Sequence, residues 1–334
     1  MSTNSKLVAV YGASGHTGKF VVAELLRRGL PVIAVGRDTS RMPAGVATRL
    51  ASIDDAAALD RAFAGCSVVI NCAGPFLDTV APIVEAALRA GSAYIDVTAE
   101  QASALSTFER YDRPAREAGV AIIPAAGFYG GLADLLASAL LGQRPADDMT
   151  VAIALDHWWP TEGTRKTGER NRVPRVVVEN GSLVPMTVPA AKTAWTFEAP
   201  HGVQDMEAMP FSEIITISRH LPVRNLRAYL NASSLHDIRD TTTPTPVAVD
   251  TQGRSAQKFV MEVVAHDSTG TRRAMARGQD IYAVTAPLVV EAAARMLQPS
   301  FHRHGALALG EAFDAEDFLR SFTPEQLTIQ LNAP

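Results

Sequence analysis

Residues 7–29, which read LVAVYGASGHTGKFVVAELLRRG, decide the fold class of this chain. The apolar run at 7–11 predicts a buried strand. From residue 17 the apolar positions recur at three- and four-residue steps, and a glycine follows at position 29, which predicts a helix. Between the two lies the glycine-rich turn GASGHTG at 12–18. A strand, a glycine-rich turn and a helix in this order form the context of a dinucleotide-binding fingerprint.

The glycines of this turn have the spacing G-x-x-G-x-x-G, with a serine where the commoner motif has its second glycine. Glycines allow a tight turn and a close approach of the backbone to a diphosphate. The amino end of the helix then offers free N–H groups and a positive dipole. A turn that only packs the strand against the helix is the alternative. The residues expected to contact a cofactor are Gly12, Ser14, Gly15, His16, Thr17 and Gly18.

The same alternation continues through the first third of the chain. Short runs rich in Val and Ile predict buried strands, and amphipathic stretches that end in a glycine predict helices. The predicted strands are 31–36, 67–74, 93–98 and 120–125, and the predicted helices are 55–65, 79–91 and 103–119. Short connections between alternating strands and helices predict a Rossmann-type, doubly wound parallel sheet covered on both faces.

Beyond residue 130 the pattern changes to longer, alternating strands. Asn180-Gly181 lies between two strand-like runs in 175–188, a strong hairpin signal, and 258–279 is a second hairpin candidate. Helices are predicted at 131–142 and 285–297, a capped helix follows Asp314 or Asp317, and 241–257 reads as a loop. This part predicts a second α+β domain that contains a mixed or antiparallel sheet.

The end of the second strand, Val35-Gly36-Arg37-Asp38, indicates which cofactor is bound. NAD-binding proteins usually place an acidic residue here to bind the ribose hydroxyls. The guanidinium of Arg37 is instead suited to a 2′-phosphate, so we expect NADP(H), with NAD(H) as the alternative. Asp38 could still serve a ribose hydroxyl, and Arg37 could be a solvated surface residue.

Two further places on the same sheet edge are candidates for cofactor contact. Asp54 follows a predicted third strand at 50–53, and its carboxylate could accept the adenine amino group or could cap the next helix. The Gly74-Pro75 turn follows the fourth strand, where ligands bind in open α/β sheets. We therefore expect Asp54, Gly74 and Pro75 to belong to the cofactor site.

At this point a family resemblance emerges. The set formed by GASGHTG at 12–18, GRD at 36–38, NCAGPF at 71–76 and YIDVTAE at 94–100 resembles the saccharopine dehydrogenase-like family. Three later segments are also similar to that family, namely 125–137, 209–230 and 305–322.

The resemblance implies hydride transfer to a C=N or C=C bond. It also implies an NAD(P)-binding domain built from the N-terminal part and a C-terminal return, here 1–128 and 280–334, with a substrate and dimerisation domain at 129–279 between them. The chain departs from family patterns at Ala99, where relatives often have a glycine, and at Tyr129 and Gly131, where they often have Asp and Pro. Saccharopine itself is not expected to be the substrate.

A reduction needs a hydride from the nicotinamide and usually a proton donor. Asp96 ends the fifth strand near the expected nicotinamide, Tyr129 lies in a glycine-rich turn between the domains, and His157 follows a strand of the second domain. These three are the catalytic candidates. For each the alternative is structural: a cap or hydrogen bond for Asp96, core packing for Tyr129 and a structural histidine for His157. The candidates for substrate contact are Phe76, Trp158, Arg165 and Lys166.

Composition excludes several other classes of function. With 31 basic and 35 acidic residues the net charge is −4, which gives no electrostatic footprint for nucleic acid or an anionic membrane. No apolar run approaches the ~20 residues that span a bilayer. The polar start MSTNSK shows no secretory signal. Cys66 and Cys72 read as packing residues, and no ligand cluster supports a metal hydrolase.

The sequence thus predicts a cytoplasmic NADP(H)-dependent oxidoreductase that acts on a small imine, enoyl or carbonyl substrate. It needs no metal, and the long strands of the second domain make a homodimer plausible. A non-catalytic NADP(H)-binding redox sensor is the rival, because it would carry the same fingerprint. No Tyr-x-x-x-Lys pair follows the fourth strand, so short-chain dehydrogenase chemistry is unsupported.

Overall fold

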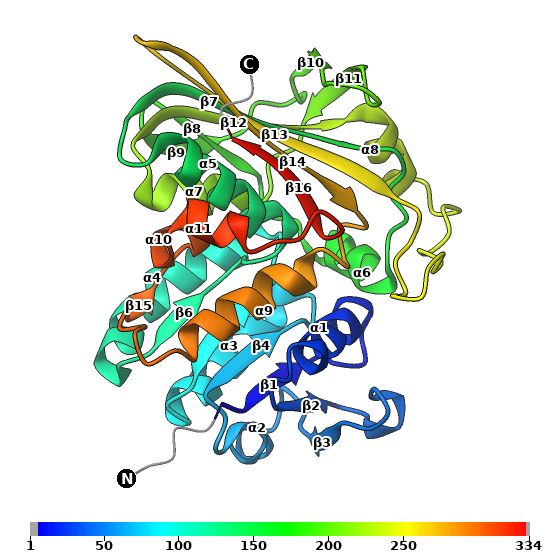
Figure 1. The fold of residues 1–334 in the computed structure, drawn as a ribbon, viewed down its shortest axis with the longest axis vertical. Coiled ribbons are helices and arrows are strands. Elements are labelled where there is room, and N and C mark those ends of the chain that lie inside the picture. The colour runs from blue at the N-terminus through cyan, green and yellow to red at the C-terminus, as the bar shows by residue number, and fades with distance from the viewer. Residues whose placement is uncertain (1–5, 332–334) are drawn as a thin grey trace.

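The computed structural model describes residues 6–331, and most of MSTNSK therefore lies outside the described residues. The chain forms two sheets, one above the other in Figure 1. The first is parallel throughout, with the strand order β15-β6-β5-β4-β1-β2-β3. Its strands are β1 (Val8–Tyr11), β2 (Val32–Gly36), β3 (Ala47–Leu50), β4 (Val68–Asn71), β5 (Ala93–Asp96), β6 (Ala121–Ile123) and β15 (Gly305–Ala306).

Helices cover both faces of this sheet, which is why β1, β2 and β4 are buried along their whole length. Two apolar clusters form on its opposite faces, one against α1 and α9 and the other against α2, α3 and α4. The helices of this layer are α1 (His16–Arg27), α2 (Ala56–Phe63), α3 (Phe76–Arg89), α4 (Gln101–Ala118) and α9 (Thr285–Met296), with a short turn η1 (Thr39–Arg41) after β2. The predicted Rossmann-type sheet is confirmed.

The second sheet is mixed, since β12 and β7 run parallel and the other pairs are antiparallel. Both predicted hairpins are present, and positive φ angles at Asn180 and Gly181 form the turn of the first. The strands are β7 (Ala146–Leu155), β8 (Val176–Glu179), β9 (Ser182–Pro185), β10 (Lys192–Thr196), β11 (Val203–Ala208), β12 (Val223–Asn231), β13 (Lys258–Asp267), β14 (Gly270–Gln279) and β16 (Leu327–Leu331).

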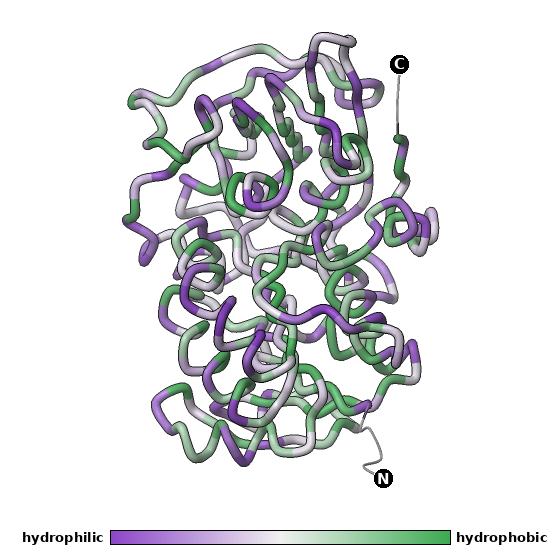
Figure 2. Tube along the Cα trace, turned by 90° about the vertical axis from the view of Figure 1, so that its left-hand side faces the viewer, coloured by the Kyte–Doolittle hydropathy of each residue, from purple (hydrophilic) through white to green (hydrophobic). Residues whose placement is uncertain are grey.

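Helices α5 and α7 pack on the side of this sheet that faces the first layer. Apolar segments gather in the interior and along the first layer, whereas outer loops are polar (Figure 2). The remaining elements are η2 (Phe128–Leu132), α5 (Ala133–Leu141), α6 (Glu162–Arg170), α7 (Glu213–His220), α8 (Ala232–Arg239), α10 (Leu309–Ala312) and α11 (Ala315–Arg320).

The C-terminal part returns to both layers. Helix α9 packs against α1 and β15 pairs with β6, whereas β16 pairs with β14 of the second sheet. Residues 327–331 therefore lie with the second sheet, and the domain limits at 128 and 280 stay a prediction. Among the described residues no helix is both long and apolar enough to cross a bilayer.

Several element boundaries differ from the sequence prediction, and two of them bear on the site. Strand β3 ends at Leu50 instead of Ile53, because its partner β2 ends at Gly36, whose carbonyl accepts the N–H of Ala51. Helix α3 begins at Phe76 instead of Thr79. The NCAGPF turn therefore leads directly into a helix at the carboxyl edge of the sheet.

Candidate functional site

The fingerprint turn has a shape that only glycine permits at two positions. Gly12 has a φ of +78°, and a Cβ added there would lie 2.9 Å from the backbone nitrogen of Ala73. A Cβ on Gly18 would lie 2.2 Å from the carbonyl oxygen of Gly12. The first turn of α1 thus lies against the end of β1, and neither Gly12 nor Gly18 leaves room for a side chain.

The amino end of α1 is free of side-chain capping. Gly15 is the N-cap residue and has no side chain that could accept a hydrogen bond, and its own N–H donates to the Gly12 carbonyl at 2.9 Å. The first N–H groups of a helix need acceptors, and a diphosphate oxygen meets that need. These residues therefore fit a dinucleotide diphosphate.

His16 adds a buried ring at the same helix end. Its ring meets Phe20 and Tyr282 edge-on at 5.3 Å each, and Nε2 has no hydrogen-bond partner among the described residues. Burial lowers the pKa of His16, so the ring is neutral at physiological pH. It can offer one donor or acceptor here but no positive charge.

The predicted adenosine end gathers Arg37 and Asp54 around Tyr11. The charges of both side chains act on the pKa of the Tyr11 phenol, which burial raises. Asp38 caps the short turn η1, since its Oδ1 accepts from the Ser40 hydroxyl at 2.7 Å and the Ser40 N–H at 2.9 Å. These two bonds lower the pKa of Asp38.

The sequence allows two roles for Asp54 and its neighbour Asp55, namely a contact with adenine and the cap of the next helix. Asp55 caps α2 by accepting the N–H of Ala58 at 2.9 Å. Asp54 is exposed, and within the described part of the chain its side chain and N–H make only long contacts of 3.4 Å with Ser52. The carboxylate of Asp54 therefore remains available to a ligand.

The Gly74-Pro75 turn lies beside the fingerprint and starts α3. Phe76, the first helical residue, is buried and its N–H donates to Glu100 Oε1 at 2.7 Å. A Cβ on Gly74 would lie 2.9 Å from the hydroxyl of Thr167, which belongs to α6 of the second layer. The second layer thus reaches the first at this turn.

Asp96 is fully buried at the end of β5 and holds three hydrogen bonds. One oxygen accepts the N–H groups of Thr98 and Ala125 at 3.0 and 2.9 Å, and the other accepts the Tyr94 hydroxyl at 3.0 Å. Burial raises the pKa of Asp96 to about 6, although these bonds oppose the shift. The bonds favour the structural role, and a catalytic role for Asp96 stays a prediction.

Tyr129 lies within an aromatic cluster where the two layers meet. Its ring is tilted by 31° against that of Phe211, with the ring centroids 4.2 Å apart, and lies 6.0 Å from Trp158. The hydroxyl has no partner among the described residues, and burial raises the pKa of this phenol well above its usual value. A protonated phenol with an unused donor is therefore present at the junction of the layers.

Glu213, which sequence reasoning did not single out, is fully buried beside this cluster. Its Oε1 accepts the N–H of Phe211 at 2.7 Å, while Oε2 has no partner in the described part of the chain. Burial raises the pKa of Glu213 to about 7, against the effect of that bond and of Arg175. Arg175 lies over the Phe211 ring at 4.7 Å. The Ser-Glu pair at 212–213 resembles an ordinary helix start, so its burial gave no sequence signal.

The structure does not bring His157 into this cluster. It is exposed and stacks on Trp159 at 5.1 Å. The neighbouring Trp158 is buried instead, and its indole N–H donates to the Tyr282 hydroxyl at 3.1 Å. A catalytic role for His157 stays a prediction.

Arg165 and Lys166, predicted to bind substrate, lie on α6. The guanidinium of Arg165 donates to the backbone carbonyls of Asp240 and Thr243 at 3.3 and 2.6 Å. Lys166 makes an exposed ion pair with Glu162 on the same helix. Both side chains are therefore already bonded to partners within the second layer.

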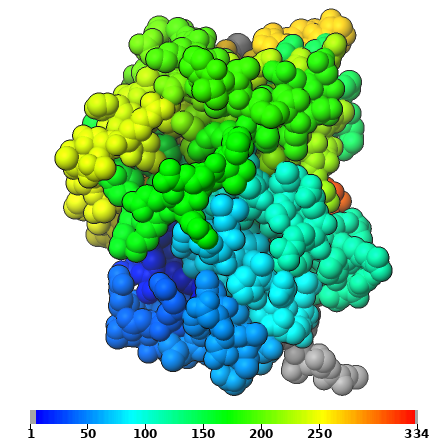
Figure 3. Space-filling model, turned by 180° about the vertical axis from the view of Figure 1, so that it is seen from behind, coloured from blue at the N-terminus to red at the C-terminus, as the bar shows by residue number. Residues whose placement is uncertain are grey.

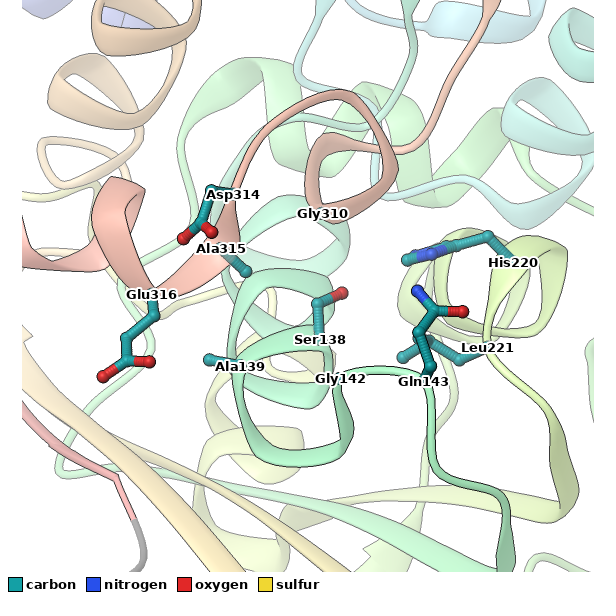
Figure 4. A pocket seen from close by; sticks show the side chains of 10 residues that line it. All are labelled: Ser138, Ala139, Gly142, Gln143, His220, Leu221, Gly310, Asp314, Ala315 and Glu316. Atoms are coloured by element: carbon teal, nitrogen blue, oxygen red, sulfur yellow. The ribbon is translucent and has the colours of Figure 1, made fainter.

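A separate polar cavity of about 260 Å³ lies between α5, the end of α7 and residues 310–316 (Figure 4). Ser138 and Gln143 line it from α5 and the residues after it, and His220 lines it from the end of α7. Nε2 of His220 lies 2.7 Å from the buried carboxylate of Asp134. None of the predicted site residues lines this cavity. Within residues 6–331 no group of three or more His, Cys, Asp or Glu side chains could hold a metal ion.

The parallel sheet, the fingerprint turn and the uncapped helix define a Rossmann-type, NAD(P)-binding class of protein. A family model described as NAD(P)H-binding matches residues 12–113. The saccharopine dehydrogenase-like oxidoreductase of Bos taurus is 29% identical over 152 residues, which cover 38% of this chain and 35% of that protein. A putative trans-acting enoyl reductase of Mycobacterium tuberculosis is 30% identical over 147 residues, covering 40% and 35%.

Among solved structures, the apo saccharopine dehydrogenase (L-Glu forming) of Saccharomyces cerevisiae has the same fold, with a TM-score of 0.68. That similarity covers 98% of this chain and all of the other at 12% identity. The resemblance to the saccharopine dehydrogenase-like family is therefore confirmed. The chain spans about a third of the length of the curated relatives it matches.

Proposed function

We propose that this protein is an NADP(H)-dependent oxidoreductase of the saccharopine dehydrogenase-like type that reduces a small C=N, C=C or C=O substrate. The observation that carries the proposal is the fingerprint turn, where Gly12 and Gly18 leave no room for a side chain. The uncapped amino end of α1 beside them suits a diphosphate. Ser14, Gly15 and Thr17, which are also predicted to touch the cofactor, belong to the same turn.

The preference for NADP(H) over NAD(H) is supported by the end of β2. One oxygen of the Asp38 carboxylate accepts both bonds from Ser40 and caps the short turn η1, which leaves only the other oxygen for a ribose hydroxyl. Arg37 and Arg41 are exposed on the same loop, where guanidinium groups suit a 2′-phosphate.

The bound cofactor would supply the hydride, and the chain would position the acceptor and supply a proton. Tyr129 is the strongest of the proposed donors, because its hydroxyl is buried, protonated and unpaired. Phe211 and Trp158 form an apolar wall around it, and Phe76 lies by the Gly74-Pro75 turn. Such a wall with few polar groups suits a small organic substrate.

The names of the relatives bear on the reducible bond. The yeast protein is named for saccharopine, which supports a C=N acceptor, and the mycobacterial protein is named an enoyl reductase, which supports a C=C acceptor. The proposal therefore includes C=N, C=C and C=O acceptors.

Two measurements test this function. Fluorescence titration with NADPH and NADH is expected to give tighter binding of NADPH, and the absence of binding of either cofactor would overturn the proposal. NADPH oxidation is then followed with panels of imines, enoyl compounds and aldehydes. Tight binding without turnover on any panel would favour the redox sensor. The homodimer and the cytoplasmic location stay predictions, and light scattering after size-exclusion chromatography tests the first.

A further inference from the structure

Helix α6 connects the two layers although it has no buried residue. Its sequence, EGTRKTGER, is polar throughout. Because no apolar face fixes such a helix, its position depends on a few polar contacts with its surroundings. Those contacts lead to both sides of the proposed cofactor site.

The carboxyl end of α6 is bonded to the first layer. Arg170 makes a two-point ion pair with Asp78 in the first turn of α3, with Nη2 to Oδ1 at 2.8 Å and Nε to Oδ2 at 3.1 Å. One turn earlier, the hydroxyl of Thr167 lies against Gly74. This end of the helix therefore covers the Gly74-Pro75 turn.

The amino end of α6 is held by the hydroxyl of Tyr282. That oxygen lies 2.9 Å from the Thr164 hydroxyl and 3.4 Å from the N–H of Thr161, and it also accepts the Trp158 indole N–H. The ring of Tyr282 lies edge-on against His16 of the fingerprint. This end of α6 is thus fixed next to the amino end of α1.

Figure 1 shows α6 beside α1 at the junction of the layers. From the opposite side, the space-filling view has a hollow where this green part of the chain meets the dark blue N-terminal elements (Figure 3). A dinucleotide that extends from the fingerprint to the Gly74-Pro75 turn runs between the two attachment points of α6. It therefore has to pass this helix on entry and on release.

We propose that α6 is a latch of the second layer that closes over the cofactor and limits the rate at which the cofactor leaves. Tyr282 holds one end of the latch and the Arg170–Asp78 pair holds the other. The proposal rests on the proposed function, since it requires a nicotinamide dinucleotide at the fingerprint. It gives the second layer a part in cofactor retention in addition to substrate binding.

The test measures the release of NADPH from the loaded protein in a stopped-flow instrument, with excess NADP⁺ as the competitor. Tyr282→Phe removes only the hydroxyl and is expected to speed release at least tenfold. Arg170→Gln and Asp78→Asn are each expected to speed it about threefold, the size suited to a partly exposed ion pair. The double variant Asp78→Arg with Arg170→Asp is expected to return the rate to within twofold of the wild type.

Arg113→Gln is the matched control, because it removes an arginine from an exposed ion pair with Glu117 on the far helix α4. Its release rate is expected to equal that of the wild type. If Tyr282→Phe failed to fold, the exposed Arg170–Asp78 pair and its charge swap would carry the test.

Release within twofold of the wild type in both Tyr282→Phe and Arg170→Gln would overturn the latch while leaving the proposed function intact. A wild type that binds neither NADPH nor NADH would instead overturn the proposed function, and the latch with it. Hydrogen exchange gives a second readout: NADPH is expected to slow exchange across residues 162–170 in the wild type and to do so less in Arg170→Gln.

Discussion

Replacing Gly18 by alanine would place a methyl carbon 2.2 Å from the carbonyl oxygen of Gly12. An ordinary contact at this position needs 3.4 Å or more, so the two groups must separate by about 1.2 Å, the difference between these distances. Neither group belongs to a flexible side chain. The amino end of α1 must therefore move away from the end of β1, at a cost of ~1–3 kcal/mol in stability.

The same movement removes the N–H groups of α1 from a bound diphosphate. Hydrogen bonds to a charged acceptor contribute ~1.5–3 kcal/mol each, so the loss of one such bond weakens NADPH binding about 10- to 150-fold. Fluorescence titration with NADPH measures this change, and thermal unfolding measures the accompanying loss of stability.

Gly29 provides the control at the other end of the same helix. It has a φ of +67° with open space around it, so Gly29→Ala costs ~1–2 kcal/mol in backbone strain without touching the fingerprint. We expect both variants to lose stability and only Gly18→Ala to lose affinity. NADPH affinity of Gly18→Ala within twofold of the wild type would refute the reasoning about the turn.

Three further substitutions test the other parts of the site. Arg37→Ala is expected to weaken NADPH binding about tenfold and to leave NADH binding unchanged, and an equal loss for both cofactors in the titration would contradict a role at the 2′-phosphate. Tyr129→Phe removes a hydroxyl that has no partner, so the melting temperature is expected to stay constant while turnover falls at least about 100-fold if this phenol donates the proton; unchanged turnover would exclude it. Glu213 has a pKa near 7 when folded and near 4.5 when unfolded, so the folded state binds the extra proton and loses stability as pH rises between these values, by ~3 kcal/mol at most. Glu213→Gln is expected to remove that part of the decline in melting temperature between pH 5 and 7, and an identical pH profile in both proteins would show that the carboxyl does not titrate there.

The first layer followed from the sequence because its signals are local. Strands such as β1 and β4 are short apolar runs, and in the helices the apolar positions recur at three- and four-residue steps. The fingerprint turn was equally readable, since three glycines between a strand and a helix have a direct steric reason. Here the local preferences and the packed structure agree.

The junction of the layers could not be predicted in the same way. Glu213 is buried because α7 packs against η2, α4 and α5, which are contacts between residues far apart in the chain. Arg165 reads as a substrate cation, yet its donors reach the carbonyls of Asp240 and Thr243, which no spacing rule brings near. The contacts of Tyr282 with His16 and Thr164 likewise join residues far apart in the chain, so they could not be predicted from the sequence.

The C-terminal return has a consequence for how this chain acquires its structure. Strand β15 completes one edge of the first sheet and β16 pairs with β14 of the second, while α9 covers a face of the first sheet. During synthesis the N-terminal layer leaves the ribosome before α9 is made, so the part of that face which α9 covers stays exposed and apolar until residues 285–331 emerge. Both layers can therefore be completed only after the C-terminal part has been synthesised, unlike a Rossmann domain that closes within its first half.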